Sequence, residues 1–198
     1  RPATLYGRDD LIARAAAALT DPHSHTPLAL TALRGLPGIG KTALALHLAH
    51  HPDVTAAFPD GILWVALGPQ MDDDTLLAEL GLFIASQGGS AQGLTTAEQH
   101  SRLLAALWQE RRLLLLLDDC WNPAHARPFV DALPPGGRCL LTTRRGSVAD
   151  DLGAAPWEVP VLDPTPSLEL LAAGGNEARR AVDADAETAA ALAHRLGH

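Results

Sequence analysis

The sequence predicts an α/β fold in which helices cover both faces of a parallel β-sheet. Short apolar runs bounded by Gly, Pro or charged residues recur along the chain, and segments with apolar residues at helical spacing lie between them. The composition is 47% hydrophobic, mostly Ala and Leu, which is enough to bury a core. Because strand and helix segments alternate, neighbouring strands are expected to run parallel to one another.

Five apolar runs are predicted to form the strands. The run at 113–117 is made of leucine alone and ends against two acids, so it is predicted to be a central strand buried on both faces. Asp118 and Asp119 follow at its carboxyl end, where ligands bind in open α/β sheets. The predicted strands cover residues 28–33, 62–67, 113–117, 138–145 and 157–162.

Helices are predicted from their start signals and apolar stripes. Asp9 or Asp10 is expected to cap the first helix, and Thr96 with Gln99 has the spacing of a capping box. Trp108 falls on the apolar stripe of its helix and is predicted to be a core residue rather than a ligand platform. The predicted helices cover residues 11–19, 43–50, 76–84, 96–108 and 124–133.

The pattern changes after residue 162. Thr165 is predicted to cap a helix with Pro166 at its first position, and an Ala-rich helical tail follows without a further strand. We therefore predict one α/β domain over residues 1–162 and the beginning of a small helical domain over residues 163–198. The second part is too short to bury a core by itself.

Residues 35–42 read Gly-Leu-Pro-Gly-Ile-Gly-Lys-Thr and fit the phosphate-loop pattern Gly-x4-Gly-Lys-Ser/Thr. They lie between a predicted strand and a predicted helix, which is the context that this motif requires. Glycines allow backbone N–H groups to wrap a phosphate chain, and the helix N-terminus adds a favourable dipole. Lys41 is then expected to reach the β- and γ-phosphates, and the Thr42 hydroxyl to reach Mg²⁺.

Lys41 is the only lysine of the chain, since all other residues of this charge are arginines. A compact ammonium suits a phosphate. Guanine-selective GTPases use an Asn-Lys-x-Asp element, which needs a second lysine, so ATP is favoured over GTP. A metabolic kinase with the same loop would need an Arg-rich lid and a substrate pocket, and neither is identifiable in the sequence.

Composition limits the partners and the compartment. The formal net charge is −8 with no basic block, which argues against non-specific nucleic-acid binding by this segment. No signal peptide is visible and the 113–117 run is far too short to span a membrane, so a cytoplasmic protein is expected. Cys120 and Cys139 are expected to be reduced. The histidines at 47, 50 and 51 are expected to be solvated or capping, with a metal site as the less favoured alternative.

Six motif-like stretches lie in order along nearly the whole chain: residues 5–9, 35–42, 58–65, 114–121, 140–144, and 159–162 with 168–171. Together they resemble one family, the STAND signalling NTPases. Within this family they are similar in particular to the NB-ARC or AP-ATPase branch, which apoptosis scaffolds, plant resistance proteins and bacterial regulators share. In the motif at 114–121, Cys120 stands where the family has Val, and Asp9 replaces Glu in the first stretch.

The resemblance implies a three-layer P-loop NTPase fold with strand order 5-1-4-3-2, an NB-ARC domain over 1–162, and a first helical domain that begins at 163. It also implies roles for the site residues. By position alone, Arg144 or Arg145 could reach a γ-phosphate. The resemblance implies that Arg144 senses the γ-phosphate, that Lys41 adds its charge at the β- and γ-phosphates, and that Asp119 orients or deprotonates the attacking water. Thr42 and Asp118 would hold Mg²⁺. The nucleotide itself would be bound by Tyr6, Gly7, Arg8, Pro37, Gly38, Ile39, Gly40, Lys41, Thr42 and Ala43.

The function implied by the resemblance is that of an ATP- and ADP-binding switch. Slow Mg²⁺-dependent ATP hydrolysis would control homo-oligomerisation and signal transduction in a longer protein, whose effector and sensor domains lie outside this chain. Two alternatives stay open at this point: a nucleotide-locked scaffold without turnover, and the NB-ARC portion of a transcriptional regulator. The composition, rich in Ala, Leu and Arg, is typical of GC-rich bacterial coding.

Overall fold

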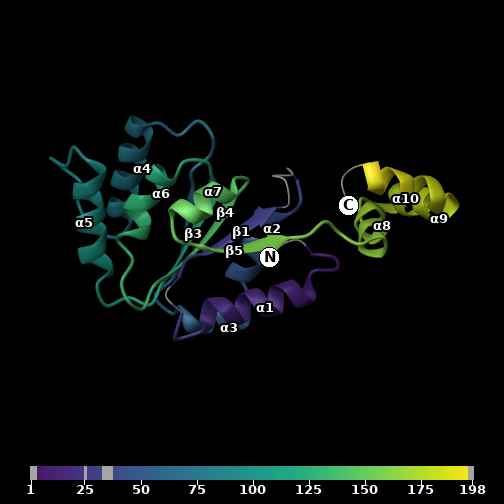
Figure 1. Cartoon of the computed structure of the whole chain (residues 1–198), viewed down its shortest axis with the longest axis horizontal. Coiled ribbons are helices and arrows are strands. Elements are labelled where there is room, and N and C mark those ends of the chain that lie inside the picture. Colours follow the sequence, from purple (N-terminus) through teal and green to yellow (C-terminus); the bar gives the residue numbers. More distant parts are fainter. Residues whose placement is uncertain (1–3, 25, 33–37, 196–198) are drawn as a thin grey trace.

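The sheet of this protein has five strands, all parallel (Figure 1). The computed structural model describes residues 4–24, 26–32 and 38–195. The strand order β2-β3-β4-β1-β5 is the predicted order 5-1-4-3-2 read from the opposite edge, so the prediction is confirmed. The strands are β1 (Leu28–Ala32), β2 (Ile62–Ala66), β3 (Leu114–Cys120), β4 (Arg138–Thr143) and β5 (Ala155–Val159).

Helices cover both faces of the sheet, as predicted. Side chains alternate along β3, so that Leu114 and Leu116 pack with α1 (Asp9–Thr20), α2 (Lys41–Ala49) and α3 (Pro52–Ala57). Leu115 and Leu117 join the core on the other face. That face is covered by α4 (Asp73–Ser86), α5 (Ala97–Trp108), α6 (Pro123–Val130) and α7 (Gly146–Asp151). The leucines of β3 are thus buried on both sides, as expected of a central strand.

The prediction of a core role for Trp108 is confirmed, because its side chain is fully buried. Its ring meets Phe83 edge to face at a centroid distance of 6.0 Å. The capping box at the start of α5 is also present: Gln99 N donates to the Thr96 hydroxyl and the Gln99 side chain accepts from Thr96 N.

Other boundaries differ from the prediction. β5 begins at Ala155 rather than 157, because Ala155 is the residue in register with Leu28 of β1. Neither Asp9 nor Asp10 is a cap; both lie in the first turn of α1, where acids interact favourably with the helix dipole. The helix after β5 starts at Pro164 rather than after Thr165, with Asp163 as its N-cap residue.

The two shortest helices, α3 and α7, have six residues each and were not predicted. Fewer than two turns give no measurable apolar period. The ring of His51 precedes α3 and accepts a hydrogen bond from Asp53 N at 3.3 Å, and His50 Nδ1 lies 2.9 Å from the carbonyl of Leu46. No group of His, Cys, Asp or Glu suited to a metal ion occurs among the described residues.

Three helices follow the sheet at the carboxyl end of the described chain: α8 (Pro164–Ala172), α9 (Asn176–Ala184) and α10 (Ala186–Arg195). They contact one another and lie beyond the edge of the sheet in Figure 1, at the green-to-yellow end of the colour scale. The division of the chain between residues 162 and 163 stays a prediction.

Gly7 is the point where the amino-terminal segment meets α8. Its φ is +60°, and a Cβ added to it would lie 2.5 Å from Cγ of Pro166. Gly153 is a matched control, since its φ is +61° and an added Cβ would have no neighbour within 4 Å. Alanine at either position should cost about 1 kcal/mol or more of backbone strain.

We therefore expect Gly7→Ala to lower the free energy of unfolding, measured with urea, by more than Gly153→Ala does. The difference between the two variants isolates the overlap with the Pro166 ring. Equal losses of stability would contradict a close contact between Gly7 and α8.

Candidate functional site

A cleft of about 410 Å³ opens at the carboxyl edge of the sheet. The carboxyl ends of parallel strands all meet at this edge, so side chains from distant parts of the sequence converge there. The loop before α2 forms one wall, and the ends of β3 and β4 form the other. The lining residues are Gly38, Ile39, Gly40, Lys41, Thr42, Ala43, Leu46, Asp119, Thr142 and Arg144.

The wall next to α2 is built from glycines and a helix start. Gly38 and Gly40 have φ values of +74° and +92°, in the region that favours glycine, and Gly40 directly precedes α2. The first residues of α2 line the cleft, which places the positive end of the helix dipole at this wall. Such a helix start is suited to an anion. Pro37, which was assigned to the same loop, lies outside the described residues.

Lys41 is the first residue of α2 and is only 8% exposed. Burial lowers the pKa of its ammonium group, and Arg144 nearby lowers it further, whereas Asp119 and Asp118 oppose the shift. An anion in the cleft would add to the effect of the two acids and favour the charged form.

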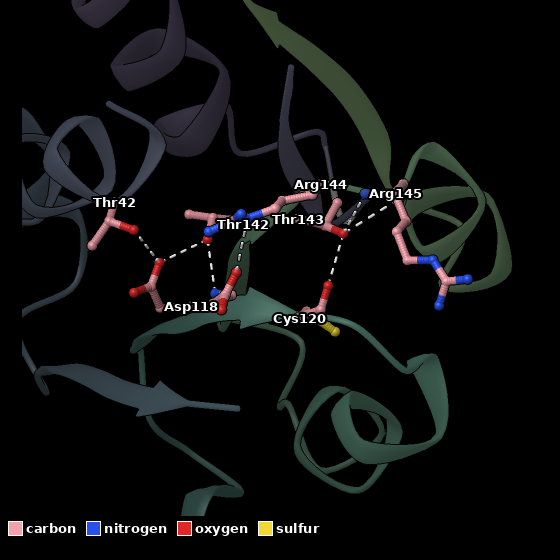
Figure 2. Close-up of polar contacts among 8 residues, drawn as sticks. Thr42, Asp118, Cys120, Thr142, Thr143, Arg144 and Arg145 are labelled. Atoms are coloured by element: carbon pink, nitrogen blue, oxygen red, sulfur yellow. Dashed lines mark hydrogen bonds and ion pairs between the residues drawn. The ribbon is translucent and has the colours of Figure 1, made fainter. Parts of the chain in front are cut away.

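Asp118 connects α2, β3 and β4 through its carboxylate (Figure 2). Its Oδ1 accepts hydrogen bonds from the Thr42 hydroxyl at 2.8 Å and from the Thr142 hydroxyl at 2.7 Å. The predicted partners Thr42 and Asp118 are therefore in direct contact, although they are 76 positions apart in the sequence.

Asp119 lies in a β-bulge. Asp118 and Asp119 stand together opposite Thr142, because the register with β4 shifts between Leu117 and Cys120. Among the described residues outside glycine, only Asp119 has a positive φ, +51°. Its backbone N–H donates to the Thr142 hydroxyl at 2.9 Å. In a regular strand the two acids would point to opposite faces, whereas in the bulge Asp118 meets Thr42 and Asp119 lines the cleft.

Arg144 follows β4 and faces the same cleft. Its Nε lies 3.6 Å from Oδ1 of Asp119, and its guanidinium carbon lies 5.5 Å from the ring centroid of Trp121. Arg145 extends in the opposite direction in Figure 2 and donates to the backbone oxygen of Trp121 at 3.4 Å. Of the two arginines, Arg144 is thus the one that the structure places at the cleft.

The predicted nucleotide-binding residues before α1 do not all lie at the cleft. Arg8 is buried, and its Nη2 donates to the backbone oxygen of Ile39 at 3.5 Å, so it abuts the glycine wall of the cleft. Burial lowers the pKa of Arg8, and Asp163 partly opposes this shift. Tyr6 and Gly7 are not among the residues that line the cleft.

Two residues that line the cleft were not assigned a role from the sequence: Leu46 and Thr142. Leu46 lies one helical turn after Thr42, so the helical period could have placed it on the same face. Thr142 is one of two threonines that follow the apolar centre of β4 at its carboxyl end, and polar residues at the end of a strand were the signal that identified Asp118.

The two cysteines are free and buried. Burial is the main reason why the pKa of Cys120 is raised to about 11, and it raises the pKa of Cys139 as well. Burial thus favours the neutral thiol form of both side chains. No helix in the described part of the chain is both long and apolar enough to cross a membrane.

A parallel sheet in the order 5-1-4-3-2, a glycine loop that leads from β1 into a helix, and an acid at the end of β3, on the other side of β4, define a P-loop NTPase fold. Comparison with known proteins narrows this class. Residues 8–181 match the NB-ARC domain, so the chain belongs to the NB-ARC family of STAND-class P-loop NTPases and is a nucleotide-binding module.

Two relatives and one solved structure illustrate the likeness. Regulatory protein AfsR of Streptomyces coelicolor is 34% identical over 150 residues, which are 72% of this chain and 14% of AfsR. Apoptotic protease-activating factor 1 of Danio rerio is 32% identical over 149 residues, 70% of this chain and 12% of that protein. The STAND protein with a tetratricopeptide repeat sensor from Pyrococcus horikoshii has a TM-score of 0.51 at 16% identity, covering 87% of this chain and 27% of that one. At this identity, the structural likeness shows the fold alone.

Proposed function

We propose that the cleft binds ADP and ATP with Mg²⁺, and that the domain is a nucleotide-dependent switch in a longer protein. The observation that carries the proposal is the contact of Thr42 with Asp118 beside the buried Lys41. Backbone N–H groups from Gly38 to Thr42 would hold the β-phosphate. The single lysine and the absence of an Asn-Lys-x-Asp element support adenine over guanine nucleotides.

The donor set fits Mg²⁺. Thr42 Oγ1 and Asp118 Oδ1 lie 2.8 Å apart, and both are oxygen atoms of the kind that this ion prefers. Magnesium sites in nucleotide-binding proteins commonly use one or two side chains and complete the shell with phosphate and water. When bound, the ion would neutralise charge on the β- and γ-phosphates. Thr42 and Asp118 are the residues that would hold it.

Hydrolysis is proposed to depend on Asp119 and Arg144. The Asp119 carboxylate, at the edge of the cleft, would orient or deprotonate the attacking water, and the Arg144 guanidinium would contact the γ-phosphate. Lys41 would neutralise charge on the same phosphate. Because Arg144 would meet only a triphosphate, it gives the domain a means to distinguish ATP from ADP.

A switch requires that ATP and ADP favour different conformations of the protein. We propose that the ATP form of the longer protein assembles into homo-oligomers and that slow hydrolysis ends this state. The chain spans 14% of AfsR and 12% of the Danio rerio factor, so effector and sensor segments would lie elsewhere in such a protein.

Titration calorimetry with ADP, ATP and GDP tests the proposal on this chain. We expect ADP and ATP to bind, ATP more tightly when Mg²⁺ is present, and GDP to bind more weakly. Phosphate release should be slower than about 1 per second, the lower end of ordinary enzyme turnover. Absence of binding by both adenine nucleotides would contradict the proposed function.

A further inference from the structure

We infer that Trp121 is a positioning residue for Arg144: its indole ring holds the guanidinium between Asp119 and the cleft. The inference rests on the proposed function, because it concerns the arginine that is proposed to contact the γ-phosphate. Trp121 itself does not line the cleft.

Two contacts hold the Arg144 side chain. The guanidinium carbon is 5.5 Å from the Trp121 ring centroid, inside the range of a cation–π interaction. Nε is 3.6 Å from Oδ1 of Asp119, an ion pair in which the side chains are 38% and 34% exposed. An ion pair this exposed is weak by itself. The ring adds a second surface, and the two contacts together restrict a long side chain that would otherwise lose much freedom on binding a phosphate.

The backbone fixes the ring and the arginine relative to each other. The Thr143 hydroxyl donates to the Cys120 backbone oxygen at 2.8 Å and accepts from Arg145 N at 3.0 Å. Arg145 Nη1 then donates to the Trp121 backbone oxygen at 3.4 Å. These bonds join Cys120 and Trp121 to Thr143 and Arg145, the residues on either side of Arg144. Figure 2 shows the Thr143 contacts.

The inferred role depends on the aromatic face of Trp121 and not on its indole N–H group. Within the described structure, Trp121 Nε1 is buried without a hydrogen-bond partner, an arrangement that costs stability. Phenylalanine would keep an aromatic face under Arg144 and remove the unpaired N–H group. Leucine and methionine would fill much of the space without an aromatic face.

The inferred role predicts an effect on triphosphate binding alone. Arg144 lines the same cleft as Lys41, so the guanidinium is already beside the proposed phosphate site before a ligand enters. A γ-phosphate could draw it from Asp119 while it stays over the ring. ADP lacks that phosphate and would gain nothing from an ordered Arg144.

The test compares dissociation constants for ADP and for the non-hydrolysable β,γ-imido analogue of ATP. We expect Trp121→Leu and Trp121→Met to weaken binding of the analogue by roughly two- to fivefold and to leave ADP unchanged, as the loss of one cation–π contact implies. Trp121→Phe should restore most of the affinity. Trp157→Leu is the matched control, since Trp157 has a similar contact with Arg14, at 5.8 Å, and does not line the cleft.

A double-mutant cycle separates positioning from general packing. In an Arg144→Ala background, Trp121→Leu and Trp121→Met should cause no further loss of analogue affinity. Equal losses for ADP and the analogue, an undiminished loss in that background, or wild-type affinities in the Leu and Met variants would overturn the role of Trp121. Failure of the wild-type chain to bind either nucleotide would instead overturn the proposed function.

Discussion

Lys41→Ala is expected to weaken the binding of both ADP and ATP at least about 100-fold, as expected when one partner of a buried, hydrogen-bonded charge pair is truncated. Lys41 is 8% exposed at the start of α2, and no other lysine exists in the chain to replace it. Loss of its ammonium group would leave phosphate charge in a partly desolvated cleft without its nearest cation. Titration calorimetry measures the effect.

The control for this prediction is Arg102→Ala, which also removes one positive charge. Arg102 forms an exposed ion pair with Glu98 on α5, on the far side of the sheet from α2. Its loss should leave nucleotide affinity unchanged, because exposed pairs contribute little and their field is screened. Binding heats of Lys41→Ala equal to those of the unmodified chain would refute the assignment of Lys41 to the phosphates.

Asp119→Asn is expected to reduce phosphate release from ATP by about 100-fold or more, the usual contribution of a positioned general base. Asparagine keeps the size of the side chain and tolerates a positive φ, so the bulge at +51° should persist. The affinity for ADP should therefore be retained. Single-turnover phosphate release together with ADP titration measures the two effects separately.

Two further variants at the same position test the backbone. Asp119→Gly should be more stable than Asp119→Ala, because only glycine adopts a positive φ without strain.

If Asp119→Asn releases phosphate at the wild-type rate, Asp119 has no part in hydrolysis. If the wild-type chain binds nucleotide but releases no phosphate, a nucleotide-locked scaffold becomes the better description of this domain.

Much of the fold could be predicted because its signals are local. The leucine run of β3 sets a buried central strand, and the segment before α5 carries its own capping box in Thr96 and Gln99. Predictions were wrong where two neighbouring residues offered equivalent signals, as at Asp163 and Thr165 before α8. The six-residue helices α3 and α7 were missed because they have fewer than two turns, too few for a repeating apolar pattern to be recognised.

The sequence by itself determined the chemistry of the site. A glycine loop followed by Lys41 and Thr42, and two acids after an apolar run, predict phosphate-binding and metal-binding groups from residue type and spacing alone. The family resemblance supplied the strand order, which the structure confirms. The residue types of the site and the strand order can both be inferred from contiguous motifs. Neither inference requires knowledge of how distant segments pack.

Only the tertiary structure decided how these groups face one another. The bulge at Asp119 depends on the register between β3 and β4, and Thr142 holds it from 23 positions away. The same register places Arg144 at the cleft, turns Arg145 away from it, and brings Trp121 under the guanidinium. Strand pairing across such separations is set by the packing of the whole sheet, so no local pattern in the sequence encodes it.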